Sequence, residues 1–99
     1  MANTELFRFE WDVDKARINL KKHDISFEEA VSIFNDPNSI TIYDENHSDT
    51  EDRFVDIGIS SEKRILVVVY MERQNIIRII SCRKGTKKEK AAYEKFNCR

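Results

Sequence analysis

The sequence predicts an α+β fold, in which helices pack on one antiparallel β-sheet. Two segments in the first 40 residues carry apolar residues at helical spacing, and several strand-like apolar runs follow them. Only short turns separate the later runs, which favours antiparallel pairing because parallel strands need a longer crossover. A chain of 99 residues builds a single modest core, so one domain is expected over residues 1–99.

The N-terminal part predicts one strand followed by two helices. FRFEWD (7–12) alternates aromatic and charged residues, as a half-buried strand does. Residues 14–24 have a thin apolar stripe and predict a partly exposed helix, which Asp24 ends where glycine would take the left-handed conformation more easily. Residues 26–37 predict the clearest helix, because a Ser-x-x-Glu capping box opens it and Asp-Pro closes it.

Four strands and a third helix are expected in the C-terminal part. Residues 39–44 and 53–60 read as strands, and residues 64–73 are apolar on both faces, which predicts a central strand. Residues 76–83 form the last predicted strand. Residues 86–96 then open with a second capping box, Thr-x-x-Glu, and predict a C-terminal helix. The expected order is β-α-α-β-β-β-β-α.

Composition bounds the class of protein. The chain is 40% hydrophobic and 35% charged, which describes a soluble globular domain without a membrane span. The N-terminus shows no apolar signal segment, so Cys82 and Cys98 are expected to be reduced thiols in the cytoplasm. For Cys82 we expect a small buried residue. Neither a metal-ligand spacing nor a nucleotide-binding glycine loop is present, so we expect no metal and no cofactor.

The net charge of −1 conceals an asymmetry along the chain. Residues 1–60 hold six Lys+Arg against 14 Asp+Glu, whereas residues 61–99 hold 11 against four. If this asymmetry persists in space, the C-terminal part presents a positive field to a polyanion. The sequence pI of about 6.1 argues that any nucleic-acid binding is local.

Arginines stand in or beside the predicted strands. Arg53, Arg64 and Arg83 lie at strand ends, where a sheet can bring them together. Guanidinium groups grip phosphate oxygens in a bidentate manner, so three of them could hold a scissile phosphate and stabilise its transition state without a metal. The alternative for each arginine is a carboxylate partner or exposure to solvent, because a guanidinium buried alone is costly.

RNA supplies its own nucleophile, the 2′-hydroxyl group. Cleavage then needs a base for that proton, a donor for the leaving 5′-oxygen and positive charge on the phosphate. His23, His47 and Glu51 are candidate bases, and Lys84 is a candidate charge stabiliser. Tyr70, near the end of the central strand, could stack an RNA base, although a core tyrosine is the commoner case.

The sequence is also compatible with two other functions. The chain could be a non-catalytic module that binds RNA or protein with a basic face. It could also be a structural domain whose arginines are all paired. Steep salt dependence would separate polyanion binding from the structural case.

Several short motifs occur together in a specific order. They are FEWD, NLKKH (19–23), SFEEA (26–30), FNDP, H-S-x-x-E-x-R (47–53), R-x-L-x-V-x-Y (64–70) and RIISCRK with TKKE (78–89). In this order and spacing they resemble the BrnT family, the toxin half of a bacterial type II toxin–antitoxin pair. The resemblance covers about residues 7–95, so we expect a single BrnT-like domain.

The resemblance implies a RelE-like ribonuclease toxin that cleaves RNA without metal and inhibits translation. It also implies a BrnA-like antitoxin with a ribbon-helix-helix part. The expected complex is a heterotetramer of two toxins and two antitoxins, which binds operator DNA only through the antitoxin. No membrane partner is implied.

The resemblance also suggests site residues. Arg53, Arg64 and Arg83, with His23 and Glu51, are the implied catalytic residues. Lys84 is also implied by the resemblance and, with Tyr70 and His47 from the residue chemistry above, completes the expected RNA-binding residues. The chain departs from the family where Cys82 and Gly85 stand in place of alanine and where Asp24 replaces glycine, which puts the position of Arg83 in question.

Overall fold

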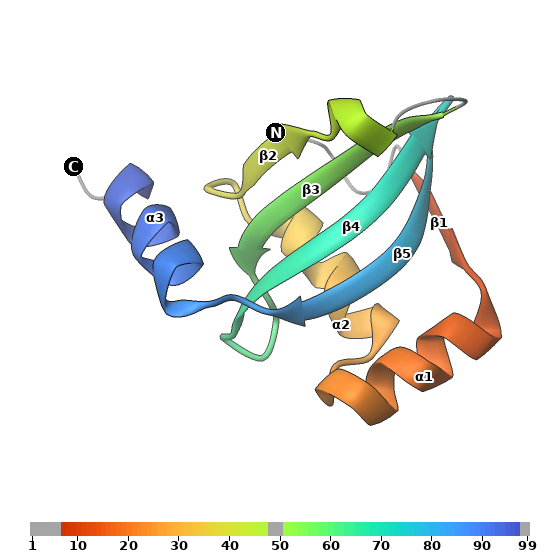
Figure 1. Ribbon diagram of the computed structural model, residues 1–99, viewed down its shortest axis with the longest axis horizontal. Helices are drawn as coiled ribbons and strands as arrows, with labels where there is room; N and C mark the ends of the chain where they lie inside the picture. Colours follow the sequence, from red (N-terminus) through yellow and green to blue (C-terminus); the bar gives the residue numbers. More distant parts are fainter. Residues whose placement is uncertain (1–6, 48–50, 98–99) are drawn as a thin grey trace.

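A five-stranded mixed sheet forms the centre of the protein, with the strand order β1-β5-β4-β3-β2 (Figure 1). The computed structural model describes residues 7–47 and 51–97. Its elements are β1 (Arg8–Trp11), α1 (Val13–His23), α2 (Phe27–Ser32), η2 (Ile33–Asn35), β2 (Ile40–Tyr43), η3 (Glu45–His47), β3 (Asp52–Ile59), β4 (Ile65–Arg73), β5 (Ile76–Lys84) and α3 (Lys87–Asn97).

The order of strands and main helices agrees with the sequence prediction, and β4 is the central strand as its apolar run indicated. The prediction of a purely antiparallel sheet is wrong, because β1 pairs with β5 in parallel. The argument from short turns applies only to strands that follow each other along the chain. β1 and β5 lie far apart in sequence, and the long intervening chain permits parallel pairing.

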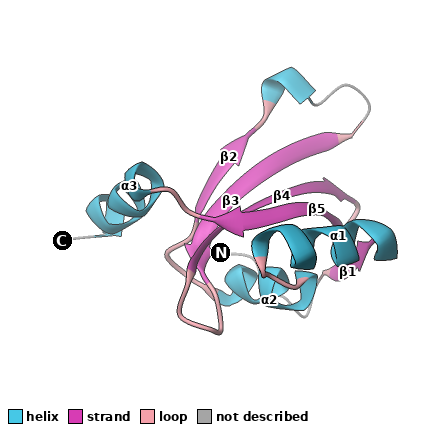
Figure 2. Ribbon diagram, turned by 60° about the horizontal axis from the view of Figure 1, so that its bottom comes forward, coloured by secondary structure: helices cyan, strands magenta, loops and turns pink. Residues whose placement is uncertain are grey.

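Helices α1 and α2 cover one face of the sheet (Figure 2). Phe27 and Ile33 of the helical layer are fully buried against Leu66, Val68 and Ile79 of the sheet. Each such side chain contributes about 2 kcal/mol through removal of apolar surface from water. This layer is the main core and fixes which side of every strand faces inward.

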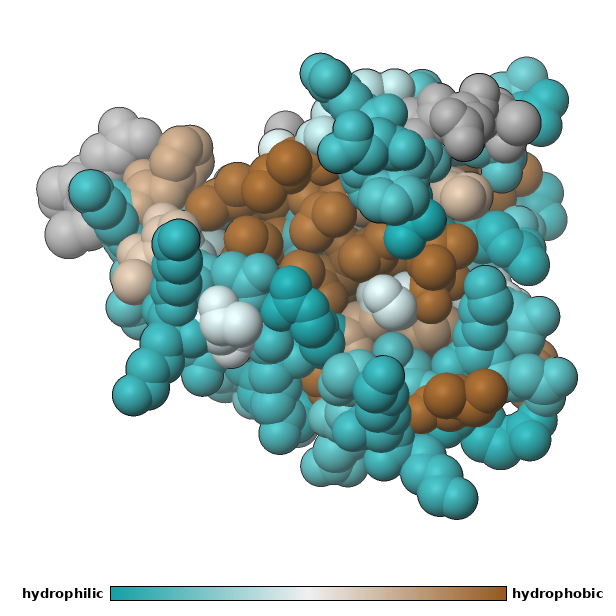
Figure 3. Space-filling model, viewed as in Figure 1, coloured by the Kyte–Doolittle hydropathy of each residue, from teal (hydrophilic) through white to brown (hydrophobic). Residues whose placement is uncertain are grey.

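The opposite face of the sheet is only partly covered, and we call it the open face. Tyr93 of α3 packs there on Ile57 and Val67, at one end of the sheet. Figure 3 shows a brown apolar area across the middle of this face, with polar side chains around it. Ile42 and Ile59 remain 49% and 37% exposed. An apolar sheet surface of this kind is a feature of binding sites.

Local signals shaped the helices as predicted, with one difference. Asp24 ends α1 in the left-handed conformation at φ 59°. The predicted second helix is α-helical only to Ser32 and continues as the 3₁₀ turn η2. At the start of α2, the Ser26 hydroxyl accepts from the Glu29 backbone N–H, but the Glu29 carboxylate turns to other partners.

Cys82 is fully buried, as expected, and burial raises the pKa of its thiol to about 12. A thiol that stays protonated is a poor nucleophile, so Cys82 acts as a core residue. Cys98 lies outside the described residues. Within 7–47 and 51–97, every helix is too short or too polar to cross a membrane.

Candidate functional site

The arginines in or beside the strands do not all meet at one place. They are Arg53, Arg64, Arg73, Arg78 and Arg83. Pleat alternation puts Arg53, Arg78 and Arg83 on the open face, since they pair across from Met71 and Val67 of that face. Arg64 precedes β4 and turns to α2 on the other side of the sheet. The structure therefore does not bring Arg53, Arg64 and Arg83 together, contrary to the prediction of three converging guanidinium groups.

Arg64 belongs to a buried network. Its Nε donates to Oε2 of Glu29 at 3.0 Å, its Nη2 donates to Oε1, and Nη2 also donates to the Asp24 carbonyl at 3.1 Å. The Ser60 hydroxyl donates to Glu29 Oε2 at 2.7 Å. The hydrogen bond from Arg64 is the main reason that the pKa of Glu29 lies below its usual value. Arg64 thus fastens the α1–α2 junction to the β3–β4 turn.

Arg83 lies on the open face and is held by Glu89 of α3. Nη1 and Nη2 donate to the two carboxylate oxygens at 2.7 and 2.9 Å. The same carboxylate accepts from the Thr86 N–H at 2.8 Å, while the Thr86 hydroxyl accepts from the Glu89 N–H. Arg83 lowers the pKa of Glu89 to about 2. The side chain of Arg83 remains 44% exposed, so the guanidinium is oriented and still accessible.

A second cluster stands at the other end of the open face. Nδ1 of His47, in η3, lies 3.0 Å from Oδ2 of Asp44, and Nε of Arg53 lies 3.7 Å from the same oxygen. The hydrogen bond with His47 is the main cause of the lowered pKa of Asp44. The His47 side chain is 62% exposed. Asp44 therefore orients an accessible imidazole beside a guanidinium.

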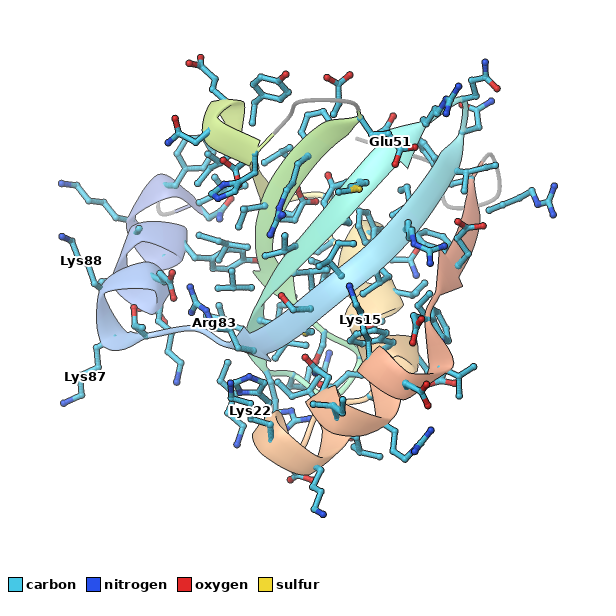
Figure 4. The ribbon with its side chains drawn as sticks, turned by 45° about the vertical axis from the view of Figure 1, so that its right-hand side comes forward. Lys15, Lys22, Glu51, Arg83, Lys87 and Lys88 are labelled. Atoms are coloured by element: carbon cyan, nitrogen blue, oxygen red, sulfur yellow. The ribbon has the colours of Figure 1, made fainter. Side chains whose placement is uncertain are left out.

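Glu51 occupies the same end of the sheet, as Figure 4 shows by its separation from Arg83. Its carboxylate lies 3.8 Å from Arg73. A cavity of about 420 Å³ includes both residues together with the Glu10–Arg78 pair. Glu51 is thus near the His47 end of the open face but is engaged with Arg73.

Tyr70 and His23 lie away from the open face. Tyr70 is 4% exposed, its ring stacks on Phe54 at 5.6 Å, and its hydroxyl donates to Asp56 at 2.9 Å. The prediction that it stacks an RNA base is wrong, because its faces are enclosed in the core. His23 ends α1, which packs on the opposite face of the sheet. Asn19, one turn earlier on α1, hydrogen-bonds the Cys82 backbone, so this end of the helix lies beside the last part of β5 on that opposite face.

Lys84 follows Arg83 and points to the other side of β5, because successive residues of a strand alternate. It lines a cavity at the sheet end together with Lys63, Arg64 and Lys90. Lys84 is therefore close to the Arg83 site in sequence but opens onto a separate basic surface.

The two clusters of the open face lie within reach of one extended ligand. Arg53 pairs across from Met71 and Arg83 from Val67. These two β4 positions are four residue steps apart. This corresponds to about 13 Å along the strand. Over residues 7–47 and 51–97, no group of three or more His, Cys, Asp and Glu side chains is placed to hold a metal ion. The chemistry offered by these residues is proton transfer by His47 and anion binding by Arg53 and Arg83.

Sequence reasoning missed the two carboxylates that orient these groups. Asp44 stands three residues before His47, a spacing that a short helical turn brings together. Glu89 was expected only as a capping residue, but its position six residues after Arg83 also gives a salt bridge across the strand–helix junction. Neither spacing is specific enough to be found without the fold.

Comparison with known proteins identifies the family. A family model described as "Ribonuclease toxin, BrnT, of type II toxin-antitoxin system" matches residues 11–89. The chain belongs to the BrnT family. The crystal structure of the Brucella abortus ribonuclease toxin BrnT is similar with a TM-score of 0.64 at 18% identity, covering 82% of this chain and 99% of that chain. At this identity the likeness establishes the fold. No curated protein matches the chain.

Membership of the BrnT family confirms the resemblance inferred from the motifs. The family is one of ribonuclease toxins of type II toxin–antitoxin systems, so an antitoxin partner is implied. The residues that carry out the reaction in this BrnT-family chain remain a prediction, for which the open face supplies the geometry.

Proposed function

We propose that the protein is a metal-independent endoribonuclease whose active site is the open face. The observation that carries this proposal is the cluster of Asp44, His47 and Arg53, which combines an oriented base with a guanidinium on the face that also bears Arg83. A base and positive charge are what cleavage by an internal 2′-hydroxyl requires.

The reaction follows from this arrangement. Asp44 accepts a hydrogen bond from Nδ1–H of His47, which leaves Nε2 to take the proton of the ribose 2′-hydroxyl. The 2′-oxygen attacks phosphorus, and the bond from phosphorus to the 5′-oxygen breaks. The leaving 5′-oxygen takes a proton from water at this open surface. The products are a 2′,3′-cyclic phosphate and a free 5′-hydroxyl.

The arginines are proposed to stabilise the extra negative charge of the transition state. Arg53 shares Asp44 with His47, so its guanidinium lies beside the imidazole ring. Arg83 keeps its orientation through Glu89, and its exposed side can donate to a phosphate oxygen. Glu51 is better explained as the partner of Arg73 than as the base, because Asp44 gives His47 a defined orientation.

The biological setting is proposed from family membership. Cleavage of RNA in the cytoplasm would inhibit translation, and the α+β fold would be of the RelE-like type. The antitoxin would be a BrnA-like ribbon-helix-helix protein that forms a heterotetramer of two toxins and two antitoxins. Only the antitoxin would then contact operator DNA.

The two histidines provide a matched test. Purified parent protein, His47→Gln and His23→Gln are incubated with single-stranded RNA and a chelator, and the products are separated and their ends determined. His47→Gln is expected to lose about 10²-fold in rate or more, as removal of a general base does. His23→Gln is expected to stay within threefold of the parent, because His23 lies off the open face.

Equal losses in both variants would contradict the role of His47. Loss of cleavage by the parent when the chelator is added would contradict metal independence. Products with 2′,3′-cyclic ends in the presence of the chelator would support attack by the 2′-hydroxyl group and metal independence.

A specific observation also favours the second candidate, a non-catalytic module that binds protein. Each of the five arginines has a carboxylate within 4 Å, and the middle of the open face is apolar. Such a face suits a protein segment better than an RNA strand. Parent protein that cleaves no RNA, either free or in a translation extract, would favour this alternative.

A further inference from the structure

A cavity of about 350 Å³ lies at the end of the sheet, where β4 begins and β5 ends. Its wall is made by Lys63, Arg64, Ile65, Lys84 and Lys90. These residues come from the β3–β4 turn, the last position of β5 and the first turns of α3. The cavity therefore joins three separate segments, and all its charged lining residues are cations.

The charge of this cavity is only partly neutralised. Glu29 forms an ion pair with Arg64 and also attracts Lys84 electrostatically. In the described part of the chain, Lys63, Lys84 and Lys90 form no ion pair within 4 Å. Three lysines around one concavity repel each other unless an anion lies between them. The arrangement is therefore complementary to an anionic group such as a phosphate.

The backbone at Lys63 has an uncommon conformation for a lysine. Lys63 has φ 64°, in the left-handed region, inside a turn closed by the hydrogen bond from its N–H to the Ser60 carbonyl at 2.9 Å. Glycine or asparagine takes this conformation more readily than lysine does. The turn thus holds a lysine in a conformation that glycine or asparagine would adopt more readily, and the residue lines the cavity.

The chain beside the cavity, at Gly85, is also closely packed. Gly85 donates its N–H to the Ile65 carbonyl at 2.9 Å, and a Cβ there would lie 3.3 Å from Ile65 Cγ2 and 3.5 Å from Lys90 Cγ. The missing side chain lets the start of α3 lie against Ile65. This contact holds Lys90 beside Lys84, so the cluster depends on the fold and not only on the sequence run.

The position of the cavity relates it to the open face. Arg83 and Lys84 are consecutive and point to opposite sides of β5. β1 pairs with β5 only from Ile76 to Ile79, and beyond it the Asn19 side chain of α1 covers the edge at Cys82, before Arg83 and Lys84. A strand of RNA with one phosphate at Arg83 can pass this end of the sheet and reach Lys84.

We propose that this cavity binds a backbone phosphate of single-stranded RNA, next to the phosphate held at Arg83. The site contributes affinity and positioning and takes no part in proton transfer. The inference rests on the proposed function, in that it takes RNA as the substrate of the open face.

The test compares two pairs of lysines from the same short segment. One variant carries Lys84→Gln and Lys90→Gln, and the control carries Lys87→Gln and Lys88→Gln. Both lose two positive charges, but Lys87 and Lys88 point away from the body of the protein (Figure 4). Binding of a fluorescein-labelled single-stranded RNA is measured by anisotropy over a range of salt concentrations, with the chelator present and with the RNA made uncleavable by 2′-O-methyl groups.

The cavity variant is expected to bind RNA at least tenfold more weakly at low salt. The slope of log affinity against log salt should fall by about 0.7, since the cavity holds one phosphate and each lost phosphate contact on a single strand removes about 0.7. Lys63→Gln alone should lower the affinity in the same direction, although it lies on a different segment. The control variant should stay within threefold of the parent with an unchanged slope.

Equal weakening in the two double variants would overturn the proposal and indicate diffuse attraction. Failure of the parent to bind RNA at low salt would overturn it as well. Inorganic phosphate is the second probe: displacement of RNA by phosphate, with no effect of sodium sulfate at equal ionic strength, would indicate a site for a free anion instead of a strand.

The outcomes separate this site from the proposed ribonuclease activity. Cavity-dependent binding of the RNA without cleavage of the unmodified strand would support the phosphate site and contradict the ribonuclease. Cleavage by the parent together with equal binding by both double variants would support the ribonuclease and contradict the phosphate site.

Discussion

Arg64 is fixed on three sides, by the Glu29 carboxylate, the Asp24 carbonyl and the turn that carries it. Glu29 is only 8% exposed, so removal of the guanidinium leaves a buried carboxylate without its main partner. Arg64→Ala is expected to lower the free energy of unfolding by about 2 kcal/mol, measured by urea denaturation. At saturating RNA the folded fraction should cleave at the rate of the parent, because Arg64 lies off the open face and, in the cavity, would affect binding only.

Arg73→Ala is the matched control, because Arg73 is exposed and lies 3.8 Å from Glu51. Its loss should cost less than about 0.5 kcal/mol. A stable Arg64→Ala protein that cleaves RNA much more slowly than the parent would show that Arg64 acts in the active site.

Glu89 gives the fold a dependence on pH. Arg83 lowers the pKa of Glu89 to about 2 from an ordinary value of 4.5, and hydrogen bonds from Thr86 act in the same direction. A lowered pKa means that the ionised pair stabilises the fold fully above about pH 4.5, and that this contribution is lost as the pH falls towards about 2. Glu89→Gln should therefore lower the free energy of unfolding by about 1 kcal/mol at pH 7 and by nothing near pH 2.

Urea unfolding of parent and variant at several pH values measures this difference. Glu29 is present in both proteins, so its contribution to the pH dependence of stability cancels in the difference between parent and variant. Glu94→Gln, an exposed position on the same helix, should show no difference at any pH. A Glu89→Gln effect that persists unchanged at pH 2 would show that the loss of charge is not its cause.

At the scale of single residues, the sequence indicates the type of side chain but not its partner. Arg64 and Arg83 both stand at strand ends in sequence. The partner of Arg64 lies 35 residues away, whereas that of Arg83 lies six residues away. Tyr70 could likewise face a ligand or the core, and only the packing of Phe34 and Phe54 decides this.

At the scale of elements, Asn19 of α1 completes the sheet where β1 stops. Its side-chain amide accepts from the Cys82 N–H at 3.0 Å and donates to the Cys82 carbonyl at 2.9 Å, as a neighbouring strand would. It also donates to the Ile25 carbonyl at 3.1 Å. One side chain thus satisfies buried backbone groups of β5 and of the α1–α2 junction.

Asn19→Ala is expected to lower the free energy of unfolding by about 3 kcal/mol, because it leaves these backbone groups buried without partners. Leu20→Ala, one residue along the same helix and 49% exposed, should cost under about 1 kcal/mol. Both values come from urea denaturation. Similar losses in the two variants would mean that water replaces the amide of Asn19.

The elements themselves were largely predictable, because local signals decide them. The Thr86–Glu89 capping box forms in full, whereas in the Ser26–Glu29 box the acid is diverted to Arg64. The sequence contains the same pattern twice, and a tertiary contact separates the two outcomes. The parallel pairing of β1 was missed for the same reason, since its partner is distant in sequence.

At the scale of the whole molecule, ion pairs within the fold neutralise part of the charge asymmetry along the chain. Acidic residues of the first 60 positions pair with basic residues of the last 39. These pairs are Glu10–Arg78, Glu29–Arg64 and Glu51–Arg73. The asymmetry in sequence therefore does not become a uniformly basic face, and the unpaired lysines gather at the end of the sheet.

The open face should also be the surface that an antitoxin covers. Ile42 projects from β2 onto this apolar area and is 49% exposed, while Ile18 of α1 is 63% exposed on the opposite side of the sheet. Ile42→Asp should weaken the complex with a BrnA-like antitoxin at least tenfold, since a carboxylate would be desolvated in an apolar interface. Ile18→Asp should bind within threefold of the parent by calorimetry. Equal affinities of the two variants would place the antitoxin on another surface and leave the open face accessible to RNA in the complex.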